Sequence, residues 1–154
     1  MLSLLFSMIN PALGTAYTLG WDLVDSGKHL DWGGSTKYQN DFNYSVNTWN
    51  NYKSGVIRKD SIIYLKDVTI SDITLKNNDA GETDGDNKTI KFNTFNIDPM
   101  NTTRRRNVCA HELGHALGLN ENPNTGNTMY YKSSDTYTLS RDDKDSYNAA
   151  VLNW

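Results

Sequence analysis

The segment HELGHALGLNE, residues 111–121, constrains this chain more than any other stretch of its sequence. His111 and His115 are four residues apart, and helical steps of about 100° place both imidazoles on one face, where they can share a metal ion. Glu112 follows the first histidine, so its carboxylate can reach a water molecule at that ion without binding the ion itself. The segment therefore predicts a helix that carries a metal site.

The helix that carries these residues is predicted over 102–117, with Asn101 or Thr102 as its N-cap. Gly118 follows where the helix must stop, and glycine can take the left-handed conformation that redirects the chain. The redirected chain can bring residue 121 back against the ion. Four residues form the opposite stripe of the helix and should face the core, so the single cysteine is expected to be a small buried hydrophobe: Cys109, Leu113, Ala116 and Leu117.

The remaining pattern predicts one α+β domain, because 154 residues suffice for a single compact core. Phe42, Val46 and Trp49 recur at helical spacing, whereas β-branched and alternating apolar residues mark the strands. The predicted elements are a helix over 41–52, one or two strands over 61–70 and 73–75, a loop over 77–87, a strand over 88–97 with a bulge near Thr94, the helix over 102–117, and a helix capped by Ser140.

The first sixteen residues, MLSLLFSMINPALGTA, are similar to the hydrophobic and cleavage regions of a secretory signal, with Tyr17 as the first mature residue. A basic leader is absent, since no Lys or Arg precedes Lys28. The alternative is a terminal segment that packs or frays. We interpret 1–16 as a signal-peptide remnant and expect a secreted, extracellular, monomeric protein.

Charge and apolar content restrict the partners of this domain. The net charge of −3 gives the whole molecule no electrostatic steering towards nucleic acid or anionic lipid. No apolar stretch is long enough to span a bilayer. We therefore expect no nucleic-acid partner and no membrane span.

HELGHALGLNE followed by NTMYY resembles the metzincin zinc metallopeptidases, most closely the small bacterial matrixin-type enzymes. TIKFNTFNID and LSRDDKDS are also similar to those enzymes, so the resemblance covers the second half of the chain well and the first half by element order only. It implies a zincin-like fold for residues 17–154: a small twisted, mostly parallel sheet with an antiparallel edge strand, an active-site helix, a methionine turn and a C-terminal helix.

The resemblance also implies residue roles. His111 and His115 would bind Zn²⁺, Glu112 would be the general base, and Met129 would form the floor of the site. The strand over 88–97 would be the edge that takes an extended peptide by strand addition, and the loop from Lys132 to Thr138 would border the pocket for the residue after the scissile bond. These roles imply a zinc-dependent endopeptidase that acts on proteins or peptides.

Two positions depart from the family pattern. Glu121 occupies the place of the third histidine, and two histidines with one carboxylate form an accepted catalytic zinc set, so we interpret it as the third ligand. Its alternative is a solvent-facing side chain above a weakly held metal, which corresponds to an inactive, zincin-like module that binds peptides or proteins. Tyr131 stands where proline is typical; it is either a hydrogen-bond donor to the developing oxyanion or a packed tyrosine.

The loop over 77–87 also offers oxygen donors of the kind that Ca²⁺ prefers. Their spacing does not match an EF-hand loop, and an acidic surface loop is the alternative. The candidate donors are Asp79, Glu82, Asp84, Asp86 and Asn87.

Overall fold

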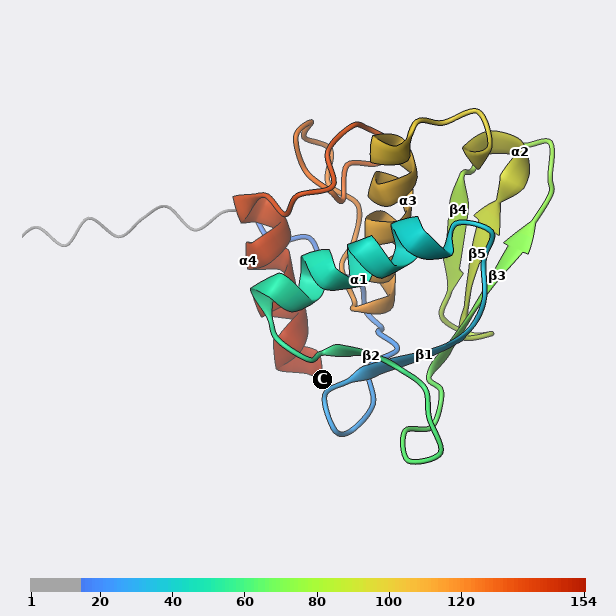
Figure 1. Ribbon diagram of the computed structural model, residues 1–154. Coiled ribbons are helices and arrows are strands. Elements are labelled where there is room, and N and C mark those ends of the chain that lie inside the picture. The colour runs from blue at the N-terminus through green and yellow to red at the C-terminus, as the bar shows by residue number, and fades with distance from the viewer. Residues whose placement is uncertain (1–14) are drawn as a thin grey trace, which may run out of the picture.

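The computed structural model describes residues 15–154, and almost all of the predicted signal segment lies outside them. Within the described residues, five strands form one sheet in the order β2-β1-β3-β5-β4 (Figure 1). Neighbouring strands run parallel except for β4, which pairs antiparallel with β5 at the edge. The expected mostly parallel sheet with an antiparallel edge strand is confirmed. The strands are β1 Leu30–Gly34, β2 Ile57–Lys59, β3 Val68–Ile73, β4 Gly81–Asp84 and β5 Thr89–Asn93.

Two long helices cover one side of this sheet and pack against each other (Figure 1). The indole Nε1 of Trp49 donates to the carbonyl of Ala110 at 2.9 Å, so the two helices are joined by a buried hydrogen bond as well as by apolar contact. The α+β prediction is confirmed, and no helix among residues 15–154 has the length and apolarity to cross a membrane. The helices are α1 Gln39–Tyr52, α2 Thr94–Ile97, α3 Thr102–Ala116 and α4 Arg141–Ala150, followed by the 3₁₀ turn Val151–Asn153.

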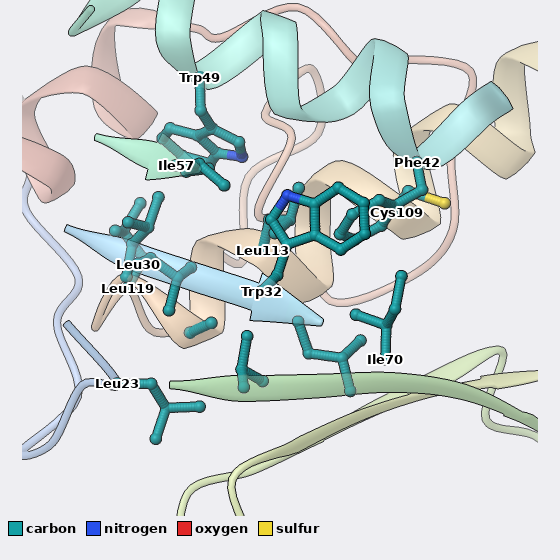
Figure 2. Packing of buried hydrophobic residues seen from close by; sticks show 14 of the residues in the cluster. Leu23, Leu30, Trp32, Phe42, Trp49, Ile57, Ile70, Cys109, Leu113 and Leu119 are labelled. Carbon is teal, nitrogen blue, oxygen red and sulfur yellow. The ribbon is translucent and has the colours of Figure 1, made fainter. Parts of the chain in front are cut away.

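The core lies between the sheet and helices α1 and α3 (Figure 2). The ring of Phe42 on α1 packs edge-to-face against Trp32 of β1 and Phe92 of β5, with centroid separations of 4.9 and 6.0 Å. Cys109 of α3 is buried among these side chains, and burial raises the pKa of its thiol well above the usual value. The cysteine is therefore the inert core residue that its helical position predicts.

The predicted ends of the two C-terminal helices agree with their capping residues. Asn101 caps α3, since its side chain accepts the N–H of Arg104 at 2.9 Å. Ser140 and Asp143 form a capping box at the start of α4. The helix that carries the histidines thus begins and ends where its caps and glycine indicate.

The strand predictions are wrong in five places. Strands β1 and β2 were not predicted, and residues 61–67 form a loop, so that the third strand begins only at Val68. The predicted loop over 77–87 contains β4, whose polar residues pair with β5 at the edge of the sheet. The predicted bulge near Thr94 is the short helix α2, because the side chain of Asn93 accepts the N–H of Phe95 and starts a helical turn.

Candidate metal centre

Three side chains meet at the end of α3 in the arrangement that the motif predicts. His111, His115 and Glu121 each offer a ligand atom, and these atoms lie within 4.8 Å of one another. The imidazole centroids are 4.6 Å apart, and Nε2 of His111 is 3.9 Å from a carboxylate oxygen of Glu121. Two imidazoles and one carboxylate around a common centre form a donor set that suits Zn²⁺ and leaves a fourth position free.

The histidine rings are already in the tautomer that binds a metal. Nδ1–H of His111 donates to the carbonyl of Thr128 at 3.1 Å, and Nδ1–H of His115 donates to the carbonyl of Leu119 at 2.9 Å. Each Nε2 is then a lone-pair donor. Burial lowers the pKa of His111 to about 3, with a smaller contribution from the neighbouring His115, so this imidazole is neutral at pH 7. The residues present therefore fit a zinc ion.

Glu121 reaches the histidines because the chain reverses directly after α3. Gly118 adopts a φ of +93°, and its N–H donates to the carbonyl of His115 at 2.9 Å. Half of the Glu121 side chain is exposed, yet its carboxylate faces His111, and partial burial raises its pKa. The structure thus places the predicted third ligand with the first two.

Met129 lies beneath the helix that carries the histidines and is almost completely buried. A Cβ atom at Gly114 would lie 2.2 Å from the Met129 sulfur, so only glycine allows the turn to approach the helix this closely. The turn is held by the carboxylate of Asp143, which accepts the N–H groups of Thr128 and Met129 at 2.9 and 3.1 Å. The prediction that Met129 forms the floor of the site agrees with this packing; the roles of Gly114 and Asp143 were not predicted.

Glu112 is buried and is held by the edge strand. The hydroxyl of Thr83 on β4 donates to Oε2 of Glu112 at 2.7 Å and also lies 3.0 Å from its backbone carbonyl. A Cβ atom at Gly81 would lie 2.7 Å from the Glu112 side chain, so β4 packs directly on this carboxylate. Burial, the largest contribution, raises the pKa of Glu112.

An open cleft of about 650 Å³ runs between these residues and the edge of the sheet. His111, Glu112 and Glu121 line one wall, and residues 78–81 line another. The strand at this edge is β4, which corrects the prediction that 88–97 is the edge strand, because β5 lies between β3 and β4. The error arose because β4 lacks the apolar alternation by which strands are predicted.

The open edge of β4 presents free main-chain groups. Strand β4 pairs with β5 in the register Gly81↔Phe92 and Thr83↔Ile90, and the N–H of Asn93 donates to Ala80 at 2.9 Å. In an antiparallel pair the hydrogen-bonded residues alternate, so the N–H and C=O groups of Gly81 and Thr83 point away from β5. An extended chain can pair with these groups.

The segment from Tyr131 to Thr138 borders the cleft with its first three residues. Tyr131, Lys132 and Ser133 line the cleft, whereas residues 134–138 do not. Tyr131 is half exposed at the rim, and Tyr130, more than Lys132, lowers its pKa. Buried Asn107 of α3 fixes the segment, since its amide donates to the carbonyl of Thr136 at 2.5 Å and accepts the N–H of Ser134 at 2.8 Å. Sequence reasoning missed Asn107, although it lies one turn before His111.

The predicted calcium donors do not converge. Among residues 15–154, acidic, histidine and cysteine side chains form two close groups, and neither includes residues 79–87. Asp84 instead accepts the main-chain and side-chain N–H groups of Asn87 and closes a turn. The second group, formed by Asp25, Asp31 and Asp67, is occupied by the guanidinium of Arg58, which bonds both oxygens of Asp31 at 2.7 Å.

Comparison with known proteins identifies the family of this chain. The sequence profile of the matrixin family matches residues 26–150. Among solved structures, archaemetzincin from Methanopyrus kandleri is similar in fold, with a TM-score of 0.58 and 14% identity over 84% of this chain and 99% of that chain. No curated protein sequence matches this chain significantly. Since the matrixin profile spans most of its length, the chain belongs to the matrixin family of metzincin-type zinc peptidases.

Proposed function

We propose that this protein is a zinc-dependent endopeptidase. His111, His115 and Glu121 would hold the ion, and Glu112 would be the general base. The observation that carries the proposal is the convergence of the three ligand atoms within 4.8 Å beside a buried carboxylate, in a cleft that opens onto a free strand edge. Family membership supports the same chemistry.

Zinc bound at this position supplies Lewis-acid polarisation of the scissile carbonyl and lowers the pKa of a water molecule. Glu112 removes a proton from the attacking water and delivers it to the departing amine. The hydroxyl of Thr83 bonds Oε2 of Glu112, which leaves Oε1 as the oxygen that accepts and returns the proton. The protein's own contribution is thus a base that is fixed before the substrate arrives.

The substrate that this cleft fits best is an extended peptide. The free N–H and C=O groups of Gly81 and Thr83 can add a strand to the sheet, as in other peptide complexes formed by β-augmentation. Such a strand would bring its scissile bond close to Glu112, because Thr83 belongs to the open edge of β4 and its hydroxyl also bonds the Glu112 carboxylate. The segment from Lys132 to Thr138 would contact the residue after that bond.

Tyr131 is proposed as a donor to the oxygen on which negative charge develops. Its half-exposed position at the rim of the cleft supports this role over that of a packed core tyrosine. Its side chain contacts those of Tyr130 and Lys132 at the surface, and hydrogen bonding to Tyr130, then to Lys132, lowers the pKa of its hydroxyl.

The proposal is tested by assaying a library of quenched fluorescent peptides. We expect hydrolysis that stops when a chelator is added and returns with one equivalent of Zn²⁺. In the same assay Tyr131→Phe should lower kcat about tenfold or more with little change in KM. Cleavage that persists after complete metal removal would contradict the proposal, and an unchanged kcat for Tyr131→Phe would exclude the assigned role of that residue.

Thr83 gives a second expected result. Thr83→Val removes the hydroxyl that orients Glu112 and should lower kcat by about 10- to 100-fold, since hydrogen bonds to charged groups contribute about 1.5–3 kcal/mol. Thr83→Ser keeps the hydroxyl and is the matched control, which should retain most of the activity. Equal activity of the valine and serine variants would show that the bond to Oε2 has no role in turnover.

The half-exposed carboxylate of Glu121 favours a second candidate, a zincin-like module that binds peptides without cleaving them. Peptide binding can be measured by fluorescence anisotropy. A chain that binds peptides at the β4 edge but cleaves no member of the library, even with zinc present, would support this second function instead.

A further inference from the structure

The loop between β2 and β3 exposes a cluster of large aliphatic side chains that the fold does not use. We call residues 61–65, with the sequence SIIYL, the apolar loop. Its side chains of Ile62, Ile63 and Leu65 expose 103%, 82% and 84% of their reference surface. Among the described residues, the other aliphatic side chain of comparable exposure, Leu152, is remote in sequence at the end of the chain. Clusters of exposed apolar side chains mark binding surfaces, whereas isolated ones are ordinary.

The exposure of the apolar loop is fixed by its own hydrogen bonds. The N–H of Ser61 donates to the carbonyl of Tyr64 at 3.0 Å, and the Ser61 hydroxyl accepts the N–H groups of Ile63 and Tyr64 at 3.2 and 3.1 Å. The chain therefore forms a tight turn that directs aliphatic side chains into solvent.

The base of the loop is anchored to β1. The Tyr64 ring packs on the guanidinium of Arg58 at 3.9 Å, and that guanidinium bonds both oxygens of buried Asp31. The N–H of Asp67 also donates to the carbonyl of Asp31 at 2.7 Å. The loop is thus a preorganised projection beyond the body of the fold (Figure 1).

Around the apolar loop the lysine side chains are exposed and the acidic ones are partly buried. Lys59 and Lys66, on either side of it, are exposed. The nearby carboxylates of Asp60 and Asp67 are partly buried, and Asp67 is turned inward to accept the N–H of Asp31 at 2.8 Å. The apolar tip therefore has an exposed lysine on each side of its base, although the whole chain carries a net charge of −3. Lys59 Nζ lies 5.7 Å from the centre of the Trp32 ring, and the stem of Lys66 lies against Gly33 beside Asp60.

We propose that the apolar loop inserts into the surface of a lipid bilayer that contains anionic phospholipids. Aliphatic side chains at the tip would enter the boundary between headgroups and acyl chains, and the lysines would contact lipid phosphates. Tyr64 has the amphipathic ring that is favoured at this depth. The proposal does not depend on peptidase activity, and it would place the catalytic domain at a membrane surface.

The size and shape of the loop favour lipid over a protein partner. A stable protein interface uses roughly 20–30 residues a side, whereas the apolar loop has five and is convex. A convex apolar tip needs a matching pocket on a protein, but acyl chains adapt to any shape. Association with a second copy of this chain is the alternative that the dye measurement below distinguishes.

Vesicle flotation tests the proposal with vesicles of phosphatidylcholine and phosphatidylglycerol. We expect the parent to float with the vesicles, and the combined variant Ile62→Ser, Ile63→Ser, Leu65→Ser to partition at least about tenfold more weakly. Lys59→Gln combined with Lys66→Gln should also weaken partitioning about tenfold. Leu152→Ser removes an equally exposed leucine elsewhere and should behave as the parent. Parent protein that stays unbound, or a triple-serine variant that floats as well as the parent, would overturn the proposal.

A labelled variant separates insertion from any loss of folding. Cys109 is buried, so an environment-sensitive dye reacts with the new thiol of Ile62→Cys and not with the native one. We expect blue-shifted, brighter emission when vesicles are added, and no change for Leu152→Cys carrying the same dye. An unchanged signal at position 62 contradicts insertion. A shift that grows with protein concentration without vesicles would show self-association in its place.

Discussion

Glu112→Gln should lower kcat/KM for peptide hydrolysis by about 10²- to 10⁴-fold, the contribution expected of a general base. Glutamine has nearly the same shape as glutamate and keeps an oxygen that can accept the hydrogen bond from Thr83. It cannot accept a proton at neutral pH. Since Glu112 is not among the three ligand residues, zinc content should stay at the level of the parent.

The matched control for this variant is Glu82→Gln. Glu82 lies on β4 between Gly81 and Thr83, and its side chain points to the opposite face of the strand and is exposed. It loses the same charge in the same part of the fold, and its activity should remain within about twofold of the parent, as expected for an exposed surface position. A Glu112→Gln variant that keeps its metal dependence and most of its turnover would remove Glu112 from the mechanism.

Asp143→Ala should reduce the free energy of unfolding by about 3–5 kcal/mol, because several main-chain donors lose one shared acceptor. The carboxylate of Asp143 accepts three main-chain N–H groups, from Thr128, Met129 and Ser140. Alanine leaves these buried donors without their acceptor, and each unsatisfied donor costs about 1–3 kcal/mol. The loss should also release the turn beneath the histidines, and zinc affinity should fall with stability.

Urea unfolding followed by tryptophan fluorescence measures this effect. Asp142→Ala is the neighbouring control, because its carboxylate has a single long contact, at 3.4 Å from the amide of Asn122. We expect a loss of about 1 kcal/mol or less for that variant. If both variants unfolded at the same urea concentration, Asp143 would not be the anchor of the turn.

The elements that could be predicted from the sequence are those with strong local signals. Helix α3 carries its own cap at Asn101 and its own stop at Gly118, and α4 begins with the capping box at Ser140. Strand β4 has no such signal, because its residues are polar and pair only through the ladder with β5. The apolar stretch over 61–65 gave a false strand, since apolar content alone does not distinguish a buried strand from an exposed tip.

The candidate site also contains residues that the sequence predicts and residues that only the fold identifies. The spacing of His111 and His115 on a helix and the glycine after it predict a shared ion without any tertiary information. The residues that support the site act across long sequence separations: Thr83 on Glu112, Asn107 on the border of the cleft, and Asp143 on the turn. Single residues of these types are common in loops and helices, so only the fold shows which ones contact the site.

The central claim is that Glu121 completes a zinc site with His111 and His115, and zinc content after exhaustive dialysis tests it most directly. The measurement compares the parent with Glu121→Ala, and with Glu121→His as a control that restores a third ligand of a different kind. We predict one zinc per chain for the parent and the histidine variant, and an affinity lowered by more than about 100-fold for the alanine variant. A folded parent that retains no zinc, or an alanine variant that retains it as tightly as the parent, would contradict this account.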